Sequence, residues 1–126
     1  KGFEKPNQWI CSDSNVVDEY NQDPLCTFIF TINGFYNLFT LMQKTYQQVD
    51  YDVNSKLPIL FISGREDPCL INEKKFTHAV KHLKNSGYQD VEEILFDEMR
   101  HEILNEVNKQ KVYSKINDFI GARDER

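Results

Sequence analysis

The chain has 126 residues, 40% hydrophobic side chains and a net charge of −5, which indicates one globular domain and excludes wholesale disorder. The acidic balance disfavours nucleic acid and anionic membranes as partners, and no apolar run approaches the roughly 18 residues of an integral membrane segment. Cys11, Cys26 and Cys69 form no CxxC pair, which disfavours a disulfide framework and a structural zinc site. Because a signal-peptide pattern is also absent, we expect a reducing, cytoplasmic location.

The first 50 residues are rich in aromatic side chains and are predicted to be helical. We expect a short helical turn over residues 16–20 and a longer helix from about Thr31 to Asp50. Apolar residues recur in the longer helix at spacings of three or four, as one helix face requires: Phe35, Leu38, Phe39, Met42, Tyr46 and Val49. Such a stripe is usually packed into a core.

From residue 57 onward the pattern changes to short apolar strands. The run Ile59–Ile62 is apolar at every position and lies between Pro58 and Gly64, which predicts a strand covered on both faces. A helix is predicted to follow, capped by Asn72 and ended by Gly87. Its inward side chains are predicted to be Phe76, Ala79, Val80 and Leu83.

A second strand is predicted over Val91–Phe96, and a final helix begins at about Asn108. The final helix is expected to bury Val112, Ile116, Phe119 and Ile120. The order strand, helix, strand, helix predicts an α/β fold with two parallel strands, flanking helices and a ligand site at the carboxyl ends of the strands. The polar residues 50–56 divide the chain into a helical part, 1–50, and an α/β part, 51–126.

Two residues with catalytic chemistry each follow a predicted strand. Asp67 comes directly after the first strand and His101 after the second. Neighbouring strands are about 4.8 Å apart, so the two loops are expected to meet at one edge of the sheet. A carboxylate that binds one imidazole nitrogen orients the ring and leaves the other nitrogen free to take a proton. Alone, Asp67 is typical of a turn and His101 of a helix start, but the pair at matched strand ends favours catalysis.

The runs LPILFISGREDP (57–68) and RHEILNE (100–106) resemble the C-terminal end of α/β-hydrolases. More narrowly, they are similar to monoacylglycerol-lipase and lysophospholipase-like serine hydrolases. The segment WICSDSNVVDEYNQDPLC (9–26) and the aromatic helix after it resemble the end of that family's helical cap. The resemblance implies that Asp67 is the acid and His101 the histidine of a Ser-Asp-His triad.

The serine nucleophile of such a triad is not found in this sequence. A serine hydrolase presents it on a G-x-S-x-G turn, and none of the serines has those flanking glycines. We therefore expect a C-terminal fragment of a serine ester hydrolase, inactive alone, that needs no metal or cofactor. A lipid-like or small ester is the expected substrate, and Phe35, Phe39 and Met42 are candidates to line an acyl-chain pocket in the cap.

Two other functions stay open at this point. The chain could be a non-catalytic binding or interaction module, or it could belong to an enzyme that uses an aspartate nucleophile, as epoxide hydrolases of the same fold do. A start codon just before Lys1 would favour the module. A serine or an aspartate on the nucleophile turn would distinguish a serine hydrolase from an enzyme with an aspartate nucleophile. Cys69 lacks a glycine turn and is expected to be a buried thiol.

Two further expectations concern metal ions and partners. His78 and His82 lie four residues apart on one helix, but both are predicted to face solvent with no third ligand nearby, which disfavours a metal site. If the chain folds alone, the strand Ile59–Ile62 has a free edge. We expect two copies to pair through that edge as a homodimer.

Overall fold

The computed structural model describes residues 3–47 and 52–124. The predicted order strand, helix, strand, helix is present after residue 58. The elements are α1 (Ser14–Gln22), α2 (Ile32–Thr45), β1 (Ile59–Gly64), the short 3-10 helix η1 (Pro68–Leu70), α3 (Glu73–Asn85), β2 (Val91–Phe96) and α4 (Lys109–Asp124).

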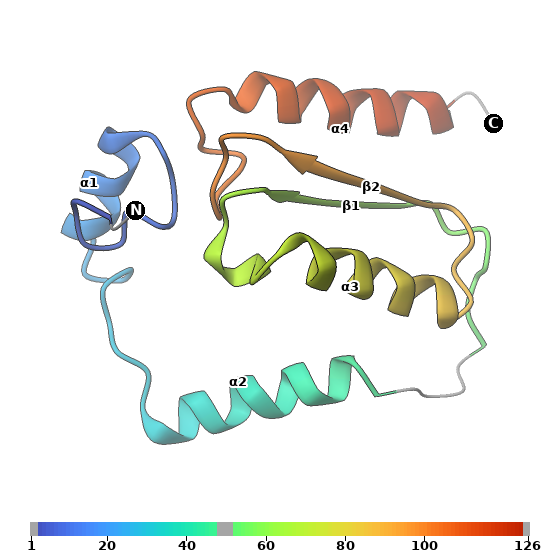
Figure 1. The fold of residues 1–126 in the computed structure, drawn as a ribbon, viewed down its shortest axis with the longest axis horizontal. Coiled ribbons are helices and arrows are strands. Elements are labelled where there is room, and N and C mark those ends of the chain that lie inside the picture. The colour runs from blue at the N-terminus through green and yellow to red at the C-terminus, as the bar shows by residue number, and fades with distance from the viewer. Residues whose placement is uncertain (1–2, 48–51, 125–126) are drawn as a thin grey trace.

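The two strands form a parallel pair at the centre of the molecule. Ile59 lies opposite Val91 and Gly64 lies opposite Phe96. α3 covers one face of this sheet and α4 covers the other (Figure 1). A strand with helices on both faces is apolar along its length, which explains the pattern of β1. Within residues 3–47 and 52–124 the sheet has two strands, and the homodimer through Ile59–Ile62 stays a prediction.

Local signals set the ends of α3 as the sequence predicts. The side chain of Asn72 accepts a hydrogen bond from the Lys75 N–H at 3.0 Å. Gly87, just beyond the helix, has φ +107°, a conformation that side chains with a Cβ rarely adopt. Phe76 and Val80 are buried, and the ring of Phe76 lies 5.2 Å from that of Phe61 on β1.

The prediction for α4 is correct in its first half and wrong at Ile120. Val112 is fully buried, and Ile116 and Phe119 are partly buried, but Ile120 is 52% exposed. A pair of strands is a narrow surface, and the apolar stripe of the helix extends past it. The spacing of three and four residues between apolar side chains therefore predicted the correct face of α4, but less of that face is covered than it predicted.

α2 departs most from the sequence prediction. It starts as expected after Thr31, whose hydroxyl accepts from the Gly34 N–H at 3.1 Å, but it ends at Thr45. Val49 and Asp50 lie outside the residues that the structure describes. The start of the predicted boundary at residues 50–56 lies outside them too. No residue of α2 is buried, so packing of its stripe into a core is wrong. The physical reason is that α3 already covers this face of the sheet, and α2 forms an outer layer (Figure 1).

The N-terminal segment and α1 lie beside the carboxyl ends of both strands (Figure 1). α1 is longer than the predicted turn and is capped by Asp13, whose side chain accepts from the Asn15 N–H at 2.9 Å. Ile10, Cys11 and Val17 form a buried cluster here. Among the helices of the described residues, none combines the length and apolarity needed to cross a membrane.

Candidate active site

The loops after β1 and β2 are joined through their main chains. The Glu66 N–H donates to the Met99 carbonyl at 2.9 Å, and the Arg65 N–H donates to the Phe96 carbonyl at 2.9 Å. Gly64 allows this approach, because a Cβ there would lie 2.6 Å from the Met99 carbonyl carbon and closer still to two carbonyl oxygens. The end of β1 is thus held against the loop that leads to His101.

Asp67 and His101 meet at this edge of the sheet, as the sequence predicts. Nδ1 of His101 lies 2.9 Å from Oδ2 of Asp67. The Asp67 side chain is only 8% exposed, whereas that of His101 is 44% exposed. Since a carboxylate only accepts hydrogen bonds, this contact assigns the proton to Nδ1 and leaves Nε2 without it in the neutral ring.

The turn after β1 fixes the orientation of Asp67. This residue caps η1, and its Oδ1 accepts from the Cys69 N–H at 2.8 Å. Pro68 occupies the first position of η1, where its missing N–H costs nothing. One carboxylate oxygen is therefore held by the local turn, and the other is aimed at the imidazole.

Trp9 is a site residue that sequence reasoning did not single out. Its ring centroid lies 5.1 Å from that of His101, with an angle of 51° between the planes. The imidazole thus has Asp67 at Nδ1 and an aromatic surface against the ring. Since Trp9 precedes both strands by some distance in the chain, no local pattern could have placed it here.

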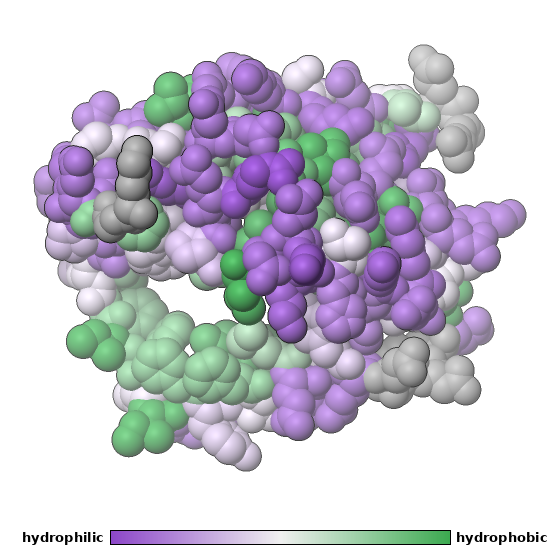
Figure 2. All heavy atoms as spheres, viewed as in Figure 1, coloured by the Kyte–Doolittle hydropathy of each residue, from purple (hydrophilic) through white to green (hydrophobic). Residues whose placement is uncertain are grey.

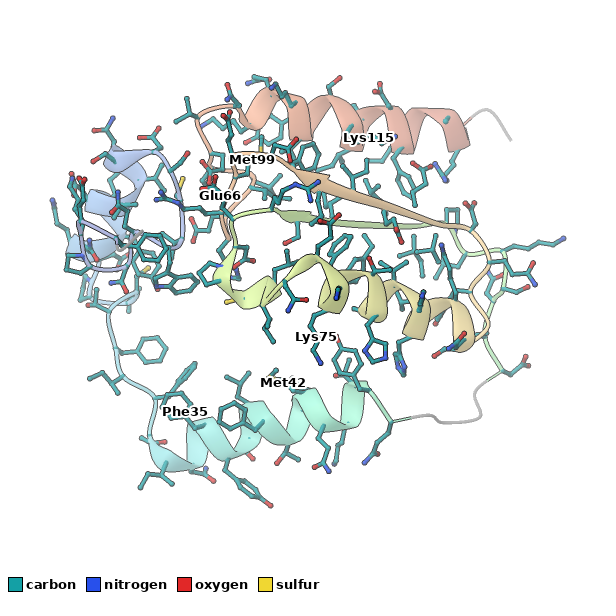
Figure 3. All side chains as sticks on the ribbon, in the orientation of Figure 1. Phe35, Met42, Glu66, Lys75, Met99 and Lys115 are labelled. Atoms are coloured by element: carbon teal, nitrogen blue, oxygen red, sulfur yellow. The ribbon has the colours of Figure 1, made fainter. Side chains whose placement is uncertain are left out.

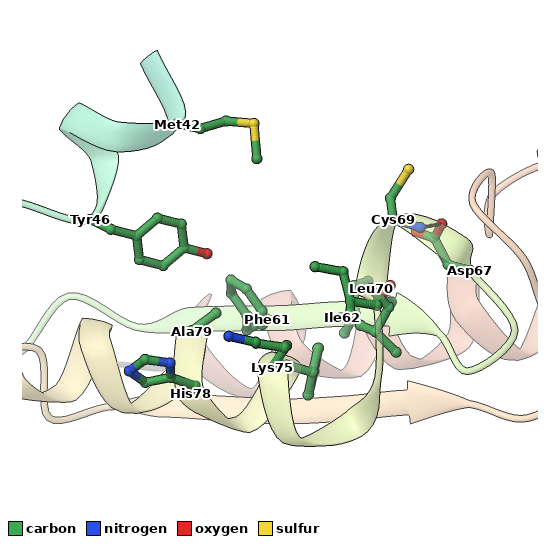
Figure 4. Close-up of a pocket in the computed structure, with 13 residues that line it drawn as sticks. Met42, Tyr46, Phe61, Ile62, Asp67, Cys69, Leu70, Lys75, His78 and Ala79 are labelled. Atoms are coloured by element: carbon green, nitrogen blue, oxygen red, sulfur yellow. Dashed lines mark hydrogen bonds between the residues drawn. The ribbon is translucent and has the colours of Figure 1, made fainter. Parts of the chain in front are cut away.

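Cys69 is exposed, because η1 turns its side chain outward (Figure 4). The prediction of a buried thiol is therefore wrong. Partial desolvation of the thiol raises its pKa above 9.0, and the negative charge of Asp67 raises that pKa further. One ligand atom each from Asp67, Cys69 and His101 lies within 4.8 Å of the others. These three side chains could hold a metal ion, so the expected absence of a metal site stays a prediction.

A cavity of about 500 Å³ opens between α2 and the layer of β1 and α3. Asp67 reaches its edge, while Met42 of α2 and Tyr46, just beyond the end of α2, face Phe61 of β1 across it (Figure 4). Of the three predicted pocket residues, Met42 lines this cavity. Phe35 and Phe39 lie outside its lining, on the exposed surface of α2, with ring centroids 6.2 Å apart.

The two histidines of α3 differ in their surroundings. His78 is exposed and lines the cavity. His82 is only partly exposed, since its Nε2 lies 3.2 Å from the Thr45 carbonyl oxygen and its ring lies 5.2 Å from that of Tyr46. The prediction that both face solvent is therefore wrong for His82, which contacts the end of α2.

Comparison with known proteins agrees with this fold. A family model described as "Serine aminopeptidase, S33" matches residues 3–108, whereas no curated protein matches the chain. The chain is similar to the crystal structure of a highly thermostable carboxyl esterase from Bacillus coagulans in complex with glycerol, with a TM-score of 0.77 and 24% sequence identity. That match covers 97% of this chain and 40% of the esterase chain, so the fold is that of part of an α/β-hydrolase. The chain belongs to the serine aminopeptidase S33 family of α/β-hydrolases.

Proposed function

We propose that the chain is part of a serine ester hydrolase, with His101 as the general base and Asp67 as the acid that orients it. The observation that carries this proposal is the 2.9 Å contact between a buried Asp67 and an accessible His101, at the carboxyl ends of adjacent parallel strands. In this proposal, the serine and the oxyanion donors come from outside these 126 residues.

The geometry suits the four proton transfers of ester hydrolysis, two in each half of the reaction. Nε2 of His101 takes the proton of the serine hydroxyl as its oxygen bonds to the ester carbonyl carbon, and Asp67 stabilises the resulting imidazolium. The imidazolium then protonates the leaving alcohol, which gives an acyl-enzyme. In the second half, His101 takes a proton from water, the hydroxide attacks the acyl carbon, and the serine regains its proton.

We further propose monoacylglycerols or lysophospholipids as the substrate class. The cavity beside Asp67 is lined mostly by apolar side chains, including Phe61 and Met42, with Lys75 and His78 among its polar ones. Exposed apolar side chains continue from it along α2, whose N-terminal part is largely green in Figure 2. A single acyl chain has the shape and polarity for such a surface, with its ester carbonyl at the His101 end. The expected roles of Phe35 and Phe39 are part of this proposal.

A substrate panel tests the class directly. The full translation product of the gene is assayed with a long-chain monoacylglycerol, a lysophospholipid, a short-chain nitrophenyl ester and an aminoacyl anilide. The proposal predicts hydrolysis of the first two, reduced when Met42 is replaced by Asp in the cavity wall. Cleavage of the anilide alone would favour the peptide chemistry that the family description names. No hydrolysis by a folded protein would favour a binding module.

A further inference from the structure

Glu106 is a buried carboxylate that the proposed proton transfers do not use. It lies in the loop after β2, five positions beyond His101, and is 1% exposed. Its Oε1 accepts from the Arg100 N–H at 2.7 Å, and both its oxygens lie 3.1 Å from the Ser12 N–H. The Ser12 hydroxyl also donates to Oε2. Each of these partners is a donor, which is what a buried carboxylate requires.

These bonds connect two segments that are far apart in the sequence. Ser12 and Glu106 are separated by 94 positions. The Arg100 guanidinium strengthens the same junction, because its Nη1 donates to the carbonyls of Gln8 at 2.7 Å and Cys11 at 2.9 Å. The Glu102 N–H donates to the Ile10 carbonyl at 2.7 Å. Both chain neighbours of His101 are thus bound to residues 8–11.

The junction also places Trp9 against the histidine. Trp9 lies within the bound segment, between Gln8 and Ile10, and its ring is 5.1 Å from that of His101. Asp67 holds Nδ1 of the same imidazole at 2.9 Å. The position of the ring therefore depends on two supports, and Glu106 joins the segment that carries one of them to the loop that carries His101.

We propose that Glu106 is a positioning residue for His101. By binding Arg100 and Ser12 at once, it keeps the Trp9 segment and the histidine loop in register, so that Nε2 of His101 points at the nucleophile. This inference rests on the proposed function, since a fixed ring orientation matters to the rate only when His101 is the base. A displacement of about 1 Å at a catalytic group costs about 100-fold in rate.

Two substitutions separate positioning from simple stability. In Glu106→Gln, the amide oxygen takes the place of Oε1 and accepts from Arg100 and Ser12, while the amide NH₂ donates to the Ser12 hydroxyl, which can also accept. In Glu106→Leu, the volume is kept, but the donors of Arg100 and Ser12 lose their acceptor. The same Glu-to-Leu change at Glu93, an exposed position of β2, is the matched control.

The experiment uses the full translation product and a fluorophosphonate probe, with binding (KI) and bond formation (kinact) measured separately. We expect Glu106→Leu to lower kinact by about 100-fold with little change in KI. Glu106→Gln and Glu93→Leu are expected to stay within about threefold of the wild type, well below the cost of displacement. Proton NMR provides a second readout, since the hydrogen-bonded Nδ1 proton of His101 should be visible in wild type and Glu106→Gln but lost in Glu106→Leu.

Unchanged kinact and an unchanged Nδ1 proton signal in folded Glu106→Leu would overturn the proposal. If Glu106→Leu does not fold, Ser12→Ala takes its place, because it removes only the hydroxyl donor. A wild-type kinact together with an unchanged Nδ1 proton signal in Ser12→Ala would then overturn the proposal. Absence of labelling in the wild type would contradict the proposed function instead, while the Nδ1 signal would still report on Glu106.

Discussion

Replacing Gly64 by Ala tests whether the stability of the protein depends on the close approach of the loops that carry Asp67 and His101. The added Cβ would lie 2.6 Å from the Met99 carbonyl carbon, and the carbonyl oxygens of Met99 and Arg100 would be closer still. All of these are backbone atoms, which cannot move aside by a side-chain rotation. The loop after β2 must therefore shift away from β1.

The expected loss of stability follows from what this shift breaks. Overpacking alone costs about 1–3 kcal/mol. Each of the two main-chain hydrogen bonds between the loops, Arg65 to Phe96 and Glu66 to Met99, contributes about 1 kcal/mol. We therefore expect Gly64→Ala to lower the free energy of unfolding by about 3 kcal/mol or more, a large part of the 5–15 kcal/mol typical of domains.

Urea unfolding followed by circular dichroism measures this change. Gly121→Ala is the matched control, because nothing lies within 4 Å of the added Cβ and the residue is in α4. Alanine in an open helical position is expected to raise the free energy of unfolding, by up to about 1 kcal/mol. The free energy of unfolding of Gly64→Ala could instead lie within about 0.5 kcal/mol of the wild-type value, well below the cost of overpacking. That result would contradict the close approach of the two loops.

Three other predictions concern charged and titratable groups. Asp67→Asn should lower kcat for ester hydrolysis by about 10⁴-fold, because the imidazolium loses its counter-charge, whereas Asp118→Asn on the exposed side of α4 should not; steady-state kinetics of the full translation product measure both. Hydrogen bonds from Arg123, and then from Lys115, lower the pKa of Glu92 below 4.5, so its contribution to stability is present above that pH and lost as the pH falls through the lowered pKa. Urea unfolding should find Glu92→Gln less stable than wild type at pH 7 and equal to it near pH 2; a difference that persists in acid would argue against the ion pair. Desolvation, and then the charge of Asp67, raise the pKa of Cys69, so alkylation of this thiol at pH 8 should be slower than that of a free thiol and faster in Asp67→Asn, as mass spectrometry would show.

The sequence predicted those parts of the site that depend on local order along the chain. Asp67 and His101 each follow an apolar strand, and parallel pairing of consecutive strands brings such positions together whatever lies elsewhere. The caps of α3 are also local, since Asn72 and Gly87 act within a few residues of themselves. These features needed no information about distant contacts.

The features that were missed or wrong depend on distant contacts or on what covers a surface. Trp9 contacts His101, and Ser12 binds the buried Glu106; each pair joins segments some 90 positions apart. No local sequence pattern near these residues indicates which partner they contact. An apolar stripe predicts which face of a helix is apolar but not whether another element covers it, and this is why α2 is exposed and Ile120 is half exposed. The outward turn of Cys69 depends on η1, which was not predicted.

Covalent labelling tests whether His101 acts as the base of a serine hydrolase. The full translation product and its His101→Ala variant are incubated with a fluorophosphonate, and the labelled peptide is identified by mass spectrometry. Attack on the probe requires an activated nucleophile. We predict labelling of one serine in the wild type and its loss in His101→Ala, with the variant still folded. Labelling that is equal in both proteins, or absent from the folded wild type, would contradict the role of His101 as the base of a serine hydrolase.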